Sequence, residues 1–427
     1  MVLEKEDKYD LAIIGAGPAG IMAACQAAKK NLRVVLIEKN ESPGKKFLLT
    51  GNGRCNLTNL EPNLRDLVAN YNNGEFLFHA FSILGPQATI DFFNQLGIKT
   101  KTEANKRVFP YKIDARGVLD ILLAYLKKNN VEIIFDSTVT DFVVQGKSSK
   151  TKKIKKVTLN TGEIQAKTYI LCSGGKSYPT TGSDGSGYVL AEKLGHTIIK
   201  PKPALCPIGL KEKWIKDVQG ISIEKVGLTI LHEDKKVLTE KGDILFTHFG
   251  ISGPVALNIS GKVGDILEKS LPINKELKIA IDLFPFLNYK EVSDGFEELV
   301  KKYPRQSLKN VLSELAPERF IKVFLTVNGI NGDKNANNMP KLEKESIAKI
   351  LKTFEVTAEN LYSFDSAMVT RGGISLKEVN HKTMQSKIIG NLYFAGEILD
   401  IDGKTGGFNL QNCWSTGYLA GKNASQK

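Results

Sequence analysis

The start of the chain alternates apolar and polar blocks in a pattern typical of a strand, a helix and a second strand. Residues 10–14 form a short apolar run, residues 21–30 are rich in alanine, and residues 33–37 are again apolar and β-branched. Two such strands on either side of a helix usually lie parallel in one sheet, joined by a right-handed connection. The opening therefore predicts a β–α–β unit.

Further apolar blocks continue this α/β pattern. A helical period over residues 116–128 leads to a strand-like run at 131–135. Short alternating runs at 139–144, 156–160 and 163–172 are separated by turn residues, including Asn160-Thr161-Gly162. We expect these runs to form a β-meander whose last strand returns the chain to the parallel sheet.

The middle of the chain has a different pattern and predicts an insertion. From residue 200 to about 281 the sequence is β-rich, whereas helical periods occur at 294–302 and 342–353. A strand-like run at 392–395 and a glycine-rich turn then resume the first domain. The domains that we expect are an α/β domain made of residues 1–199 and 376–427, an inserted β-rich domain made of 200–289 and 355–375, and a small helical domain at 290–354.

Composition and charge narrow the class of protein. No apolar run approaches the roughly 20 residues of a membrane-spanning helix, and the N-terminus is charged where a signal peptide would be apolar. We therefore expect a cytoplasmic protein. The five cysteines are scattered singly, without the spacing of a disulfide framework or a zinc site, so no metal is expected. They are Cys25, Cys55, Cys172, Cys206 and Cys413.

The net charge of +13, from 59 basic and 46 acidic residues, could draw the protein to nucleic acid or to anionic substrates. Part of this charge is concentrated in the lysine-rich segment 147–156, which reads as a solvated hairpin end. An RNA-binding patch is the alternative for this segment.

The first chemical signal is Gly15-Ala16-Gly17-Pro18-Ala19-Gly20, which follows the first strand and opens the helix. In a GxGxxG of this kind the first glycine permits a tight turn, the second lets the backbone approach a pyrophosphate, and the third lets helix and strand pack closely. The helix N-terminus adds free amide groups and a positive dipole end.

Glu38 strengthens this signal, because it closes the second strand 23 residues beyond Gly15. A carboxylate at that position can accept hydrogen bonds from both hydroxyls of an adenosine ribose, and it disfavours a 2′-phosphate there. The alternative is a surface glutamate after a strand.

Two further glycine-rich stretches could contact the same ligand. Gly396-Glu397 and the turn Gly406-Gly407 followed by residues 408–411 could bring an acidic side chain and helix amides to a flavin, with a structural helix cap as the alternative. The loop at residues 43–58 contains Gly51, Gly53 and Arg54 and could pass close to a diphosphate, or it could be an ordinary surface loop.

These stretches, together with residues 173–185, 246–254 and 369–373, resemble a bacterial family of NAD(P)/FAD-dependent flavoproteins over essentially the whole chain. This family includes aminoacetone oxidases and the flavin reductases of bile-acid dehydroxylation. The blocks Thr-Gly-Asn-Gly-Arg-Cys-Asn at 50–56 and Gly-Gly-Phe-Asn-Leu-Gln at 406–411 carry the resemblance most specifically.

The resemblance implies a Rossmann-like, three-layer FAD domain of the glutathione-reductase type, an inserted β-barrel-like domain and a small helical domain. FAD is the implied cofactor. The cofactor-binding residues that we expect are Gly15, Ala16, Gly17, Pro18, Ala19, Gly20, Glu38, Lys39, Lys45, Thr50, Gly51, Gly53, Arg54, Cys55, Asn56, Val139, Ser173, Gly174, Gly175, Gly396, Glu397, Gly407, Phe408, Asn409, Leu410 and Gln411.

The substrate side is less defined, because members of this family carry out different reactions. Thr247, His248 and Arg371 are candidates for orienting a carbonyl or a carboxylate, although a histidine in an apolar run is more often structural. We expect hydride transfer between flavin N5 and a small organic substrate, with NAD(P)H as a transient electron donor. A flavin amine or aminoketone oxidase and a flavin-dependent RNA-modifying enzyme are the alternatives.

Overall fold

The computed structural model describes residues 8–146, 152–270 and 276–426. It divides the chain into two compact units, which we treat separately. The first unit spans Met1–Lys202 and Met368–Lys427, and the second spans Pro203–Ala367. Residues 147–151 of the lysine-rich segment lie outside the described residues, so the expected hairpin end there stays a prediction.

The first unit is built on a central sheet with the strand order β6-β2-β1-β9-β8-β7, and β18 also pairs with β9. β1 runs parallel to β2 and to β9, with Leu11 opposite Val34 and Thr168. The predicted β–α–β opening and the meander that returns to the parallel sheet are thus confirmed. The strands are β1 (Lys8–Ile14), β2 (Val34–Ile37), β6 (Glu132–Ile134), β7 (Val139–Gln145), β8 (Lys153–Leu159), β9 (Gly162–Leu171) and β18 (Leu392–Phe394).

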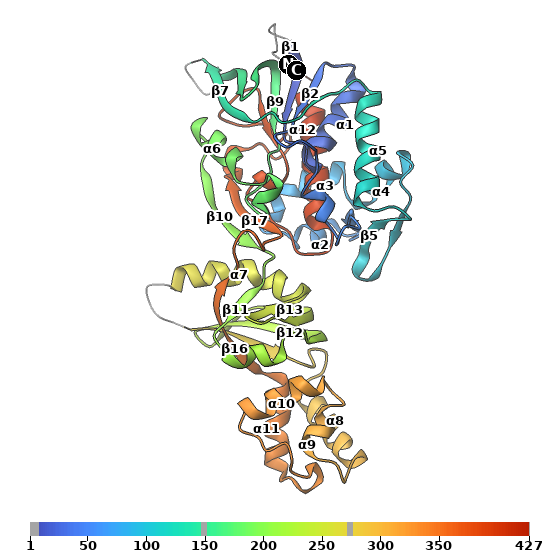
Figure 1. Ribbon diagram of the computed structural model, residues 1–427, viewed down its shortest axis with the longest axis vertical. Helices are drawn as coiled ribbons and strands as arrows, with labels where there is room; N and C mark the ends of the chain where they lie inside the picture. The colour runs from blue at the N-terminus through green and yellow to red at the C-terminus, as the bar shows by residue number, and fades with distance from the viewer. Residues whose placement is uncertain (1–7, 147–151, 271–275, 427) are drawn as a thin grey trace. The chain divides into compact units, whose positions relative to one another are not determined.

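Two helices from opposite ends of the chain, α1 (Pro18–Ala27) and α12 (Phe408–Ala424), lie against one another in this unit (Figure 1). Small residues form their contact. A Cβ atom at Gly417 would lie 2.3 Å from the carbonyl oxygen of Ala19, and one at Gly421 would lie 2.4 Å from that of Ala23. Both helices are almost fully buried in the core of the unit. This contact fixes the C-terminal segment to the N-terminal β–α–β unit.

Other elements complete the first unit. The helix α5 lies beside α1, and a small antiparallel sheet has the order β3-β5-β4. β10 pairs with β17 where the chain leaves and re-enters the unit. These elements are β3 (Thr58–Asn59), β4 (Thr100–Thr102), β5 (Arg107–Pro110), α5 (Ala115–Lys128), β10 (Ile198–Ala204) and β17 (Val369–Ile374).

The second unit is a closed barrel with the strand order β11-β14-β13-β12-β15-β16, and its helices lie between barrel strands in the chain, α7 before β15 and α8 to α11 between β15 and β16. Phe320 and Phe324 of α10 contact Phe354 of β16, so the helices and the barrel share one apolar core. The elements are β11 (Ile208–Leu210), β12 (Ser222–His232), β13 (Lys235–Phe246), β14 (Gly250–Ser252), α7 (Pro254–Ser270), β15 (Leu277–Asp282), α8 (Tyr289–Lys302), α9 (Leu308–Leu312), α10 (Glu318–Val327), α11 (Lys341–Lys352) and β16 (Phe354–Leu361).

The mixed α/β fold class predicted from the sequence is confirmed, and the β-rich stretch of the insertion is a barrel. Within the described residues, no helix combines the length and the apolarity that crossing a membrane requires.

The α1–α12 contact generates a stability prediction. Gly417→Ala and Gly421→Ala place a methyl group against a backbone carbonyl, so each variant should lose about 1 to 3 kcal/mol of unfolding free energy. Denaturant unfolding followed by fluorescence of the buried Trp414, in a Trp214→Phe background, measures this loss. Gly295→Ala in α8 is the matched control, because a Cβ there meets nothing within 4 Å. Equal stability of Gly417→Ala and the parent would contradict the proposed role of the contact.

Candidate functional site

The turn between β1 and α1 forms the base of the site. Gly15 has φ +101°, and a Cβ there would lie 2.5 Å from the carbonyl oxygen of Cys172 on the neighbouring strand end. A Cβ at Gly20 would lie 1.9 Å from the carbonyl oxygen of Gly15, so the third glycine allows the helix to start directly against the turn. Nothing lies within 4 Å of a Cβ at Gly17, and this glycine lines an open pocket.

Glu38 follows β2 and is held in a defined orientation. Its side chain is buried, with 6% exposure. Oε2 accepts a hydrogen bond from the Ala16 amide at 2.9 Å, and Oε1 accepts from the amide and the side-chain Nδ2 of Asn40 at 2.9 and 2.8 Å. A carboxylate has about four lone-pair positions, so these bonds fix the group and leave it acceptor capacity for a ligand.

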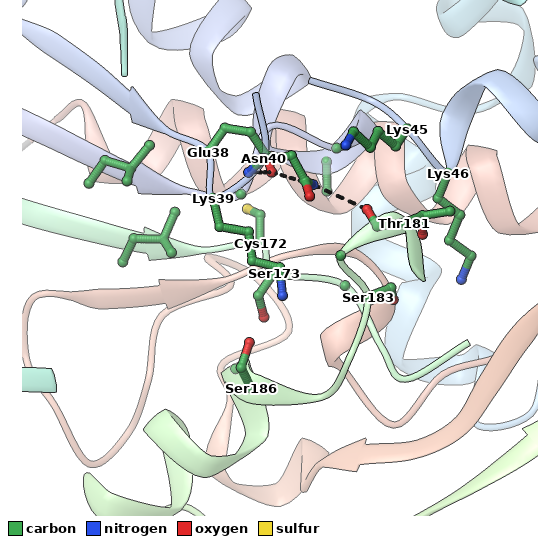
Figure 2. A pocket seen from close by; sticks show the side chains of 18 of the residues that line it. Glu38, Lys39, Asn40, Lys45, Lys46, Cys172, Ser173, Thr181, Ser183 and Ser186 are labelled. Carbon is green, nitrogen blue, oxygen red and sulfur yellow. Dashed lines mark hydrogen bonds between the residues drawn. The ribbon is translucent and has the colours of Figure 1, made fainter. Parts of the chain in front are cut away.

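The pocket lies where segments distant in sequence meet (Figure 2). The empty space that these segments enclose, including the open mouth, is about 930 Å³. Of the expected cofactor residues, those that line it are Gly15, Gly17, Pro18, Ala19, Glu38, Lys39, Lys45, Val139, Ser173, Gly174 and Glu397.

Two buried hydroxyls in this pocket indicate that it suits a polar ligand. Ser173 Oγ and Ser183 Oγ have no hydrogen-bond partner among the described residues, and the side chains of Ser173 and Ser186 point toward one another (Figure 2). Unpaired buried hydroxyls cost free energy, which a ligand with its own donors and acceptors would recover. Together with the Gly15–Gly20 turn and Glu38, they fit the hydroxyls and phosphates of an adenine dinucleotide such as FAD.

Ion pairs connect the walls of the pocket. Lys46 Nζ lies 2.8 Å from Glu397 Oε2, and Glu397 Oε1 accepts from the Thr370 amide at 2.8 Å. Lys39 Nζ lies 2.8 Å from Asp184 Oδ2. Burial tends to raise the pKa of Asp184, but Lys39 and hydrogen bonds from Ser186 lower it overall, so this carboxyl stays ionised.

The cysteines beside the pocket are poor redox groups. Cys172 and Cys413 both line the pocket, and burial raises the pKa of each thiol, that of Cys413 to about 12. Because the thiolate is the reactive form, both remain protonated and unreactive near neutral pH.

The C-terminal glycine turn is held by its own side chains. Gly407 has φ +102° and lies against the backbone of Thr58. The side chain of Asn409 accepts from the Gly403 amide and donates to the Gly403 carbonyl, both at 2.8 Å. Gln411 is fully buried and donates to Leu84 and to neighbouring hydroxyls. The Asn409 and Gln411 side chains therefore bind the protein itself, and Phe408 and Leu410 are buried; contact of their backbone amides with a flavin stays a prediction.

The remaining expected cofactor residues do not line the pocket. Gly175 and Gly396 lie behind it: a Cβ at Gly175 would lie 2.4 Å from Thr370 Oγ1, and one at Gly396 would lie 2.7 Å from the Ala19 Cβ. The segment Thr50, Gly51, Gly53, Arg54, Cys55 and Asn56 forms a separate tight turn, in which Cys55 and Asn56 are buried and Arg54 is exposed.

The three candidate catalytic residues lie in different units. Thr247 and His248 belong to the second unit, where Thr247 Oγ1 accepts from the Gly250 amide at 3.1 Å and His248 is exposed beside Phe249. Arg371 belongs to the first unit and forms a two-point ion pair with the buried Asp402, at 3.0 and 3.1 Å. A role for each of them in catalysis stays a prediction.

Sequence reasoning missed several residues of the pocket. Asn40 and Lys46 directly follow the predicted residues Lys39 and Lys45 in the sequence. The position of Asn40, two residues after Glu38, could have identified it as part of the site. Thr181 and Ser183 come from the loop after β9, and Ser186 is the first residue of α6 (Ser186–Lys193). They carry no such signal, since their place depends on long-range folding. Asn40 Nδ2 donates to the Thr181 carbonyl at 3.1 Å and so connects this loop to β2.

A Rossmann sheet with this turn, this glutamate and this pocket defines a dinucleotide-binding protein. A family model described as HI0933-like protein Rossmann domain matches residues 9–423. The chain is 32% identical to a 3-dehydro-bile acid delta(4,6)-reductase of Clostridium scindens, over 98% of this chain and 99% of the relative. It is 29% identical to a ribosomal RNA dihydrouridine synthase of Haemophilus influenzae, over 97% and 98% of the two chains.

The chain therefore belongs to the HI0933-like family, and it is an FAD-dependent oxidoreductase. Among solved structures, a 3-ketosteroid delta1-dehydrogenase from Sterolibacterium denitrificans has a TM-score of 0.55 at 9% identity, covering 98% of this chain and 99% of the other. This likeness shows the shared fold.

The position of Glu38 generates a binding prediction. Glu38→Ala removes charge-assisted hydrogen bonds worth about 1.5 to 3 kcal/mol, which should weaken FAD binding roughly 10- to 150-fold. Titration of the apoprotein with FAD measures this change. Glu41→Ala, which removes an exposed carboxylate three residues away, is the matched control. Unchanged FAD affinity in Glu38→Ala would show that Glu38 is not the ribose ligand.

Asp400 generates a pH prediction. Burial, and after it the charge of Asp402, raises the pKa of Asp400 to about 6, whereas an aspartate in an unfolded chain has a pKa of about 3.9. Between these values the native state binds more protons than the unfolded state, so this group's contribution to stability falls as pH rises. The unfolding free energy of Asp400→Asn minus that of the parent should therefore increase from about pH 4 to pH 6 and stay constant above pH 6. A difference that does not change with pH would contradict the raised pKa of Asp400. Asp120→Asn, which changes an exposed aspartate, is the control.

Proposed function

We propose that this protein is an NAD(P)H-dependent flavin reductase that saturates a carbon–carbon double bond conjugated to a carbonyl group. The observation that carries the proposal is the nature of the two relatives that match nearly the whole chain. In chemical terms, a bile-acid delta(4,6)-reductase and a dihydrouridine synthase both add two hydrogens to such a bond. The overall reaction consumes one NAD(P)H and one proton for each bond saturated.

The pocket supports the cofactor half of this proposal. FAD, when bound and reduced by NAD(P)H, would supply a hydride from its N5. The Glu38 carboxylate, held by Ala16 and Asn40, would accept hydrogen bonds from the ribose, and the turn at Gly15 and Gly17 would admit the pyrophosphate next to the α1 N-terminus. The Lys46–Glu397 pair would keep the N-terminal and C-terminal walls of the site together.

On the substrate side, we propose that Arg371 orients and polarises the carbonyl, whereas roles for Thr247 and His248 in the second unit stay predictions. The ion pair with Asp402 restricts the guanidinium of Arg371 to one orientation, which suits a positioning role. A hydrogen bond to the carbonyl oxygen would stabilise the negative charge that develops there when hydride adds to the far end of the double bond.

The sequence bears on how NAD(P)H would bind. A resident NAD(P) domain would add a second strand-anchored GxGxxG, whereas the sequence has this motif only at Gly15. NAD(P)H would therefore visit the flavin transiently. An amine or aminoketone oxidase, which passes electrons to oxygen, is the alternative for the same site.

Anaerobic mixing of the purified FAD protein with NADH and with NADPH tests the proposal. We expect one of the two to bleach the flavin absorbance, a conjugated enone to restore it within a few turnovers, and an oxygen pulse to restore it more slowly. A flavin that neither nucleotide reduces would contradict the reductase. Reoxidation that is faster with oxygen than with any enone would favour the oxidase.

Uridine in RNA is a second candidate substrate, and two observations favour it: the ribosomal RNA dihydrouridine synthase relative and the net charge of +13. Mass spectrometry of ribosomal RNA from cells with and without the gene tests it directly. Loss of a dihydrouridine in the deletion strain, restored by the intact gene but not by a Glu38→Ala copy, would support this substrate. Identical nucleoside profiles would exclude ribosomal RNA and leave small-molecule enones.

A further inference from the structure

A second concave site lies in the first unit, apart from the cofactor pocket. It is a groove between the β3-β5-β4 sheet and the start of α5, and its lining includes Arg54, Lys101, Lys112, Asp114 and Gly117. None of these residues lines the cofactor pocket. We call this feature the basic groove.

The basic groove has more positive than negative charge. Arg54 Nη2 and Lys101 Nζ both contact the same oxygen of Glu103, Oε1. Lys112 adds a third cation, and Asp114 on the lining adds a second carboxylate. One carboxylate cannot neutralise two cations, so Arg54 and Lys101 keep attraction for a further anion. Lys101 first, and Arg54 after it, hold the pKa of Glu103 below its ordinary range, against the effect of desolvation, so this carboxyl stays ionised.

Arg54 is held ready to bind. The centre of its guanidinium lies 4.1 Å from the ring centroid of Phe109, a cation–π contact that fixes the plane of the group while half of the side chain stays exposed. The turn that carries it is closed by hydrogen bonds from the Arg54 and Cys55 amides to Gly51 and Thr50. A planar guanidinium with fixed orientation suits two-point recognition of a phosphate.

The backbone around the groove adds two features. α5 begins at Ala115, whose amide donates to the Gly53 carbonyl at 2.9 Å, so the positive end of this helix adjoins the Arg54 turn. Lys112 has φ +63°, an uncommon left-handed conformation for a lysine, two residues before the helix cap Asp114. Such conformations are found preferentially at functional sites.

From this geometry we infer that the basic groove is a phosphate-binding site, with Arg54, Lys101 and Lys112 as its cationic contacts. The ligand is a phosphate ester. Its phosphate belongs either to the backbone of an RNA or to a nicotinamide dinucleotide, and both sources present the same chemistry to these three side chains. The inference concerns binding and does not rest on the proposed reaction.

The test uses FAD-loaded protein and the variant Lys101→Ala/Lys112→Ala. Its matched control is Lys127→Ala/Lys128→Ala, which removes the same charge from the other end of α5. Arg54 is left intact because it belongs to the predicted cofactor loop. FAD content and melting temperature of both variants verify that the first unit is intact.

Two probes distinguish the sources. Anisotropy of a labelled hairpin RNA, measured over a salt series, gives the affinity and the salt slope. Anaerobic calorimetric titration of protein whose FAD has been reduced beforehand, so that no hydride is transferred, gives the affinity for NADPH. If the phosphate belongs to RNA, the groove variant should bind RNA about tenfold more weakly, with a salt slope reduced by about one to two, and should bind NADPH as the parent does. If it belongs to the dinucleotide, NADPH affinity alone should fall about tenfold. In both cases Lys101→Arg/Lys112→Arg should restore binding.

Equal losses in the groove variant and the control would show a net-charge effect and overturn the inference. Unchanged affinity for both probes would overturn it as well. Neither result depends on whether the protein reduces an enone, so failure of the basic groove and failure of the proposed reductase can be told apart.

Discussion

The contact between α1 and α12 is the constraint on which the rest of the first unit depends. The two helices come from opposite ends of the chain, and glycines at 417 and 421 let their backbones approach closely. Close packing of small residues aligns the helices accurately, because any added side-chain atom would meet a carbonyl oxygen. Through this contact the N-terminal turn, Glu38 and the Glu397 region become parts of one pocket.

The binding groups of the pocket are held in fixed orientations by the surrounding protein. The turn at Gly15 is possible only with glycine geometry, and Glu38 is held by three hydrogen bonds before any ligand arrives. Preorganised groups of this kind bind without a further cost of ordering. The same argument applies to Arg54, whose guanidinium is held over the ring of Phe109. The basic groove therefore contains an oriented cation in addition to its lysines.

The parts of this account that sequence could predict are the local ones. The β1–α1–β2 order, the glycine turn and Glu38 follow from short-range patterns, and the structure confirms the α/β fold and places these residues at one pocket. The lining by Thr181 and Ser183 could not be predicted, because no local pattern indicates which distant loop will meet β2. Asn409 and Gln411 belong to a motif that can be recognised in the sequence. In the structure, however, their side chains form hydrogen bonds within the protein.

The central claim is that the pocket recognises the adenosine half of FAD through the Gly15–Gly20 turn and Glu38. The most direct measurement is titration of the apoprotein with FAD and with FMN, which carries the same flavin without the adenosine. The account predicts that FAD binds at least about 100-fold more tightly, since the lost contacts are worth roughly 3 kcal/mol or more. Equal affinity for FAD and FMN would contradict it.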